Sequence, residues 1–173
     1  MKKIWFLFLG LISCSVWGQF PVKIYAYSQV EMPGIVPARI MDENGHLINT
    51  KKEPPVNYYI YGAFAVSAKI GFTEIWINGK YYKTETAAID STPVISINYD
   101  IPAAPFKEIL VPSAKLRVIS ITPVGSPVPE PVRTSWFRNM VKHAELIVSY
   151  FYKGKKYFTG INKIKKLRPV AGV

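Results

Sequence analysis

Short runs of alternating apolar and polar residues, separated by glycine and proline, constrain the fold of this chain more than any other feature. In Val56–Ser67 the even-numbered positions are the more apolar set, and Val22–Val30 and Val94–Asp100 alternate in the same way. A period of two places successive side chains on opposite faces of a strand, whereas a helix has a period near 3.6. The pattern therefore predicts short, half-buried strands.

The dipeptide Asn78-Gly79 predicts a hairpin with a two-residue type I′ turn, because both residues tolerate the positive φ angles that this turn requires. A two-residue turn fixes the register, so Trp76 is expected opposite Tyr81 and Glu74 opposite Lys83. These two pairs share one face of the hairpin. The other face is predicted to point into the core, and it carries Ile75, Ile77 and Tyr82.

Other segments carry weaker local signals. Hairpin tips are predicted at 42–46 and 153–154, a central strand at 115–122, and a helix of at most two turns at 135–142 with Thr134 or Ser135 as its N-cap. The proline-rich run 123–132 cannot donate regular ladder hydrogen bonds, so we expect a loop or a crossover there. Seven to nine strands without long crossover helices predict an all-β fold, a single antiparallel β-sandwich of immunoglobulin-like type.

The first 18 residues have the pattern of a bacterial secretory signal. Two lysines precede the apolar stretch Ile4–Ile12, which is too short to span a bilayer as a helix of about 20 residues. Cleavage after Gly18 is one expectation. The other is lipidation of Cys14, because Leu11-Ile-Ser-Cys14 resembles a lipobox. Either way we expect a single domain over 19–173 that is exported to the periplasm, the outer membrane or the medium, without a transmembrane span.

Positive charge gathers at the C-terminal end. The chain has 22 Lys and Arg against 11 Asp and Glu, and residues 153–173 hold seven cations and no carboxylate side chain. We expect a basic C-terminal hairpin over 146–168. Its lysines could protect a sheet edge, or they could attract an anionic partner, which outside the cytoplasm is not a nucleic acid. The candidate binding cations are Lys163, Lys165, Lys166 and Arg168.

Aromatic residues are the second candidate for binding, because tyrosine and tryptophan offer large rigid contact area at small entropic cost. Tyr59 and Tyr61 lie on the weaker face of their predicted strand, and Trp76 and Tyr81 share the outer face of the predicted hairpin. We therefore expect Tyr59, Tyr61 and Tyr81 to be exposed, whereas Trp76 is either exposed with them or the core tryptophan of the sandwich.

Enzyme chemistry finds little support in the sequence. The single cysteine, Cys14, is removed or lipidated, and neither His46 nor His143 lies near a Gly-x-Ser-x-Gly motif. Turn chemistry explains the polar residues at 42–46, so no metal site, catalytic residue or cofactor is predicted.

The leading functional hypothesis is an exported, non-catalytic module of the cell envelope that binds a protein or an anionic glycan or lipid. One alternative is a secreted hydrolase with an unrecognised carboxylate or histidine site. Another is a structural subunit completed by a partner strand, which would leave a long unpaired edge near 155–165. Because neighbouring cations repel one another, replacing these four with Gln should leave the fold intact or slightly more stable while weakening association with an anionic glycan, lipid or protein.

Overall fold

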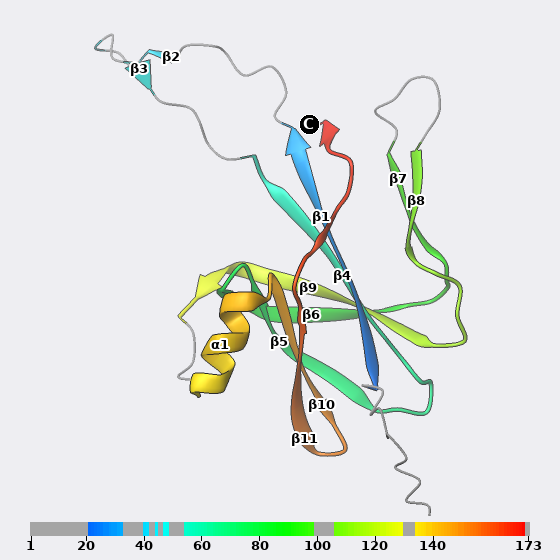
Figure 1. Cartoon of the computed structure of the whole chain (residues 1–173). Coiled ribbons are helices and arrows are strands. Elements are labelled where there is room, and N and C mark those ends of the chain that lie inside the picture. Colours follow the sequence, from blue (N-terminus) through cyan, green and yellow to red (C-terminus); the bar gives the residue numbers. More distant parts are fainter. Residues whose placement is uncertain are drawn as a thin grey trace, which may run out of the picture.

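The computed structural model describes residues 21–32, 40–41, 44, 47–48, 54–98, 106–129 and 134–171. These residues form strands and one helix, which confirms the all-β prediction (Figure 1). The elements are β1 (Val22–Met32), β2 (Ile40–Met41), β3 (Leu47–Ile48), β4 (Val56–Phe64), β5 (Ile70–Ile77), β6 (Lys80–Ile89), β7 (Val94–Asn98), β8 (Phe106–Val111), β9 (Arg117–Val128), α1 (Ser135–His143), β10 (Leu146–Tyr152), β11 (Lys155–Ile161), β12 (Lys165–Lys166) and β13 (Val170–Ala171).

The main sheet is one continuous curled series of strands in the order β11-β10-β5-β6-β9-β4-β1-β12, and β13 also pairs with β1. β12 and β13 run parallel to β1, and the other pairs are antiparallel, so the sheet is mixed. An antiparallel immunoglobulin-like sandwich is not confirmed. Such a sandwich encloses its core between two separate sheets, whereas here one sheet bends around the core.

Two turns adopt the type I′ geometry. The φ angles are 50° and 77° at Asn78 and Gly79, and 48° and 73° at Lys153 and Gly154. The first turn produces the predicted register, with Trp76 opposite Tyr81. The predicted tip at 42–46 connects β2 to β3, although only Asn44 of that tip is described. Residue chemistry at these turns therefore sets the pairing of the strands that flank them.

The proline-rich run departs from its prediction, because β9 continues through Val128 and pairs with β6 along most of its length. β4 pairs with β9 only from Arg117 to Ser120. Beyond Ser120, β9 is hydrogen-bonded on one side only among the described strands, so prolines are tolerated there. Gly125, at φ 68°, lies in this part of the strand.

The first core fills the inside of the curl. Tyr157 and Ile161 of β11 pack against it from one end of the sheet and Val22 of β1 from the other. Ile164, in the segment after β11, is 4% exposed and lies in the same core. The buried members are Val22, Ala26, Ile60, Phe64, Phe72, Ile75, Ile77, Ile121, Leu146, Val148, Tyr150 and Ile164.

We call residues 162–171 the C-terminal strap, because they leave β11 and pass along β1 (red in Figure 1). The Leu167 N–H donates to the Ser28 carbonyl at 2.8 Å, and Leu167 is buried in a second core with residues of β1, β4, β8 and β9. The buried members of this core are Tyr27, Tyr61, Ala63, Leu110, Val111, Val118 and Leu167. The predicted basic hairpin thus ends at Ile161, and the cations after it belong to the strap.

Helix α1 matches its prediction within one residue, and Thr134 is the N-cap, accepting a hydrogen bond from the Phe137 N–H at 3.4 Å. The helix covers the outer face of β5 and β10. Phe137 packs there against Trp76 with ring centroids 4.8 Å apart, and these two residues form a third core with Ile147.

Candidate anion-binding tip

The four aromatic candidates do not form an exposed surface. Tyr61 is 8% exposed in the second core, so its expected exposure is wrong, and Trp76 is 1% exposed beneath α1, so of its two alternatives it is a core residue. Tyr59 and Tyr81 are half-buried. The cause is that the face of the sheet opposite the first core is also covered, by α1 over β5 and β10 and by β8 and the C-terminal strap over β1 and β4.

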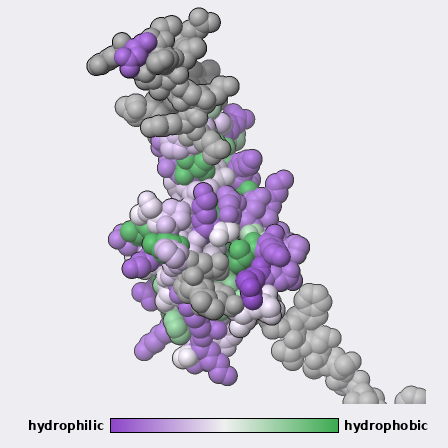
Figure 2. Space-filling view, turned by 90° about the vertical axis from the view of Figure 1, so that its left-hand side faces the viewer, coloured by the Kyte–Doolittle hydropathy of each residue, from purple (hydrophilic) through white to green (hydrophobic). Residues whose placement is uncertain are grey.

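Contacts within the protein also engage the two half-buried tyrosines. The Tyr59 hydroxyl donates to the Gln29 Oε1 at 3.1 Å, and the Tyr81 ring lies 5.2 Å from that of Trp76. Burial raises the pKa of the Tyr61 hydroxyl. Seen from the side that carries α1, hydrophobic residues form separate patches between hydrophilic side chains (Figure 2).

The four cations of the strap lie on the surface, and two of them contact side chains of β8. Lys163, Lys165, Lys166 and Arg168 are all exposed. The Lys165 ammonium lies 2.6 Å from a Glu108 carboxylate oxygen of β8, and this hydrogen bond raises the pKa of Lys165. The Arg168 guanidinium stacks 3.8 Å from the centre of the Phe106 ring. Between these cations, Ile164 and Leu167 point into the two cores.

Cations near the β10–β11 turn have a different environment. Lys156 forms a salt bridge with Glu74 at 2.5 Å, whereas Lys153 lies over the Tyr152 ring, 5.3 Å from its centre. Lys153 also borders two adjoining hollows of about 550 and 560 Å³ at the end of the sheet where β1 begins. Lys69, from the connection between β4 and β5, borders both hollows as well.

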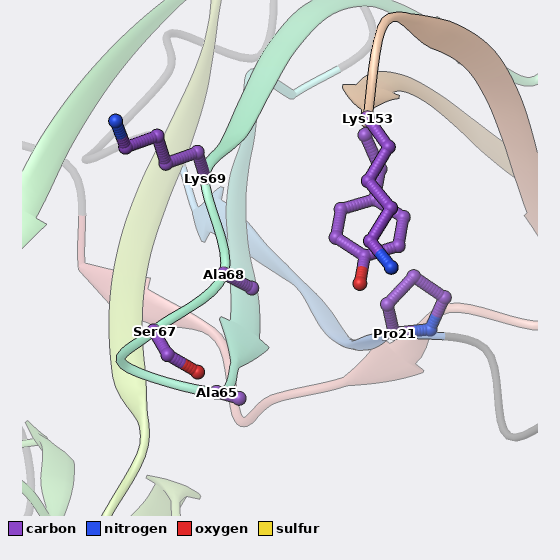
Figure 3. Close-up of a pocket in the computed structure, with 7 residues that line it drawn as sticks. Pro21, Ala65, Ser67, Ala68, Lys69 and Lys153 are labelled. Carbon is purple, nitrogen blue, oxygen red and sulfur yellow. The ribbon is translucent and has the colours of Figure 1, made fainter.

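Figure 3 shows the first hollow. Lys153 and Pro21 lie on one side of it, and Ala65, Ser67 and Ala68 lie on the other, while Lys69 extends away from it. The second hollow adds Arg117, at the start of β9, and Phe151 of β10. Strand pairing brings these parts together, because Arg117 lies opposite Phe64, the last residue of β4. We call this end of the molecule the basic tip, and its principal residues are Val66, Lys69, Leu116, Arg117, Phe151 and Lys153.

The electrostatics of the basic tip are one-sided. Neither hollow is lined by an acidic side chain. The register of β6 and β9 carries Asp90, which follows the Ile89–Val118 pair, to the position beside Arg117, but Asp90 lines neither hollow. Within the described parts of the chain, none of Lys69, Arg117 and Lys153 takes part in an ion pair. Three unpaired cations around two shallow hollows form a surface suited to an anion.

Catalytic chemistry gains no support from the described residues. They contain no group of three His, Cys, Asp or Glu side chains that could hold a metal ion. A third hollow, of about 290 Å³ beside the Asn78-Gly79 turn, holds His143 and Glu145 but neither serine nor cysteine. Glu145 there accepts a hydrogen bond from the Ile164 N–H at 2.7 Å. His46, Cys14 and the expected signal segment lie outside the described residues.

Comparisons of the chain with protein families, curated proteins and solved structures find no match. Among the described residues, α1 falls well short of the length and apolar character that crossing a membrane would require. The sequence interpretation included Lys153 in the basic end but overlooked Lys69 and Arg117. Both residues follow or begin strands at the same end of the sheet, a signal that becomes readable only once the pairing of β4 with β9 is known.

Proposed function

We propose that this chain is an exported, non-catalytic binding or adaptor module of the bacterial cell envelope, and that its basic tip binds an anionic partner. The observation that carries the proposal is the pair of adjoining hollows that share Lys69 and Lys153 and lack an acidic lining. Unpaired cations close to one another repel, and a bound anion reverses the sign of that interaction. Export rests on the N-terminal sequence pattern alone.

One observation favours the alternative of a subunit completed by a partner strand, since β11 ends the main sheet and, among the described strands, pairs only with β10. One feature weakens it. Lys155 and Lys156 lie on this edge strand, and lysines there oppose strand addition.

A matched pair of variants tests the proposed function. Lys69→Gln/Lys153→Gln removes two cations from the basic tip, and Lys163→Gln/Lys166→Gln removes two from the strap, so both variants have the same net charge. Retention on immobilised heparin, a soluble polyanion, is measured as the salt concentration needed for elution. We expect the tip variant to elute at clearly lower salt than the parent and the strap variant nearly with the parent, because salt screens the attraction between exposed charges.

Equal losses in the two variants would show that retention follows net charge rather than the hollows. A larger loss in the strap variant would return the function to the cations first nominated from the sequence. All four side chains are exposed, so thermal unfolding should show that neither variant is misfolded.

A further inference from the structure

The basic tip combines its cations with exposed apolar side chains. Val66 is 68% exposed in the connection after β4, Phe151 is 44% exposed in β10, and Leu116 is 38% exposed just before β9. Each is next to the hollows: Ala65 and Ser67 flank Val66 and line the first, while Phe151 itself and Arg117, the neighbour of Leu116, line the second. Attraction of a soluble polyanion depends on the cations, whereas these apolar groups offer the basic tip a second kind of contact.

We propose that the anionic partner is the headgroup surface of an anionic phospholipid membrane, on which the basic tip docks; this inference rests on the proposed function. Lysine and arginine near such a surface are attracted to its negative potential. Apolar side chains between them insert into the boundary between headgroups and acyl chains, which is the pattern of proteins that lie on a membrane without crossing it. Val66, in the connection between β4 and β5, is the most exposed of the three apolar side chains.

The point where the chain enters the fold is at the same end. Pro21, the first described residue, lines the first hollow (Figure 3). Cys14, the possible lipid attachment site, precedes Pro21 by seven residues. An extended chain spans at most about 3.6 Å per residue, so a lipid on Cys14 would hold the tip within roughly 25 Å of the bilayer. Docking by the tip is thus compatible with both expected modes of processing.

Vesicle binding tests the proposal on protein that carries Cys14→Ser, which cannot be lipidated, purified after processing. Co-sedimentation is measured with vesicles of phosphatidylcholine alone and of phosphatidylcholine mixed with phosphatidylglycerol. The variants are Lys69→Gln/Lys153→Gln, Val66→Ser/Phe151→Ser and the strap control Lys163→Gln/Lys166→Gln. We expect binding to the anionic vesicles only, a loss of roughly tenfold or more in the first variant, a loss of several-fold in the second, and little change in the third.

Heparin retention separates the two proposals. The Val66→Ser/Phe151→Ser variant keeps every cation, so we expect it to be retained on heparin like the parent while it loses vesicle binding. Unchanged vesicle binding in that variant would overturn membrane docking and leave the proposed function standing, with a soluble glycan or an acidic protein as the partner. Unchanged heparin retention in the Lys69→Gln/Lys153→Gln variant would overturn both.

Two further outcomes are decisive. Equal binding to neutral and anionic vesicles would contradict the role of charge in docking. If Phe151→Ser lowers the melting temperature, the double variant Val66→Ser/Leu116→Ser is used in place of Val66→Ser/Phe151→Ser. Val66 and Leu116 both lie in connections between strands. A loss of anionic vesicle binding in this second pair, with heparin retention intact, supports membrane docking, and no loss overturns it.

Discussion

The C-terminal strap and the basic tip have similar composition but opposite relations to the fold. In the strap, cations alternate with Ile164 and Leu167, which fill two cores, and the Lys165 and Arg168 side chains lie against Glu108 and Phe106. In the tip, Lys69 and Lys153 border open hollows and take part in no ion pair among the described residues. Density of positive charge along the sequence is therefore a poor guide to which cations the fold leaves without an ion pair.

The difference follows from what each segment does for the sheet. The strap bridges the two ends of the curl, because it leaves β11 and adds β12 and β13 in parallel to β1. Its cations are the outward side of a segment whose inward side is apolar. The tip instead joins three connections that are distant in sequence, and its cations contribute to no core.

Removing a core side chain from the strap should give the largest effect. Ile164→Ala leaves a cavity in the first core, where Ile164 is 4% exposed, and we expect it to lower the free energy of unfolding by about 2–5 kcal/mol. Val66→Ala in the tip, which removes apolar atoms from a side chain that is 68% exposed, should change it by less than about 0.5 kcal/mol. Denaturant unfolding measures both, and comparable effects would end the distinction between the two regions.

Neutralising the four cations of the strap should change the free energy of unfolding less than Ile164→Ala does. Replacing Lys163, Lys165, Lys166 and Arg168 with Gln removes one ion pair and two cation–π contacts, so we now expect a loss of about 1 kcal/mol rather than the neutral or slightly stabilising effect expected from sequence. The tip variant Lys69→Gln/Lys153→Gln should be neutral or slightly more stable, since it relieves repulsion. A strap variant that unfolds at higher denaturant than the parent would restore the first expectation.

Local structure was largely predictable from the sequence because few neighbouring residues determine it. Asn78-Gly79 sets a turn and with it the register of β5 and β6, and Thr134 begins α1 as an N-cap. The proline-rich run was misread because a missing N–H excludes a strand only where both edges are paired. Beyond Ser120 one edge of β9 has no partner among the described strands.

The exposure of the aromatic side chains and the position of the basic tip could not be predicted from neighbouring residues in the same way. A period of two shows that the two faces of a strand differ, but it does not show what covers the less apolar face. Tyr61 is covered by Leu110 and Leu167, far along the chain, and Trp76 by Phe137 of α1. The basic tip likewise depends on pairings between distant strands, so no local pattern brings Lys69 and Arg117 to the same end of the sheet.

The smallest effect concerns the single ion pair that distinguishes Lys165 from the tip cations. Glu108→Gln removes the carboxylate that lies 2.6 Å from Lys165. An ion pair at the protein surface contributes about 0–1 kcal/mol to the free energy of unfolding. Because Glu108 raises the pKa of Lys165 above its ordinary 10.5, the stabilisation is complete below that value and is lost as the pH rises through the raised pKa. The stability difference between parent and variant should therefore be present at neutral pH and close in strongly alkaline solution.

The same variant should also release Lys165 to bind anions. We expect Glu108→Gln to elute from heparin at slightly higher salt than Glu85→Gln, which makes the same change in net charge at an exposed position of β6. The gain should disappear when Lys165→Gln is added. If the two acidic variants elute at the same salt concentration, the ion pair with Glu108 does not limit anion binding by the strap. The position of the strap cations along β1 must then set that limit.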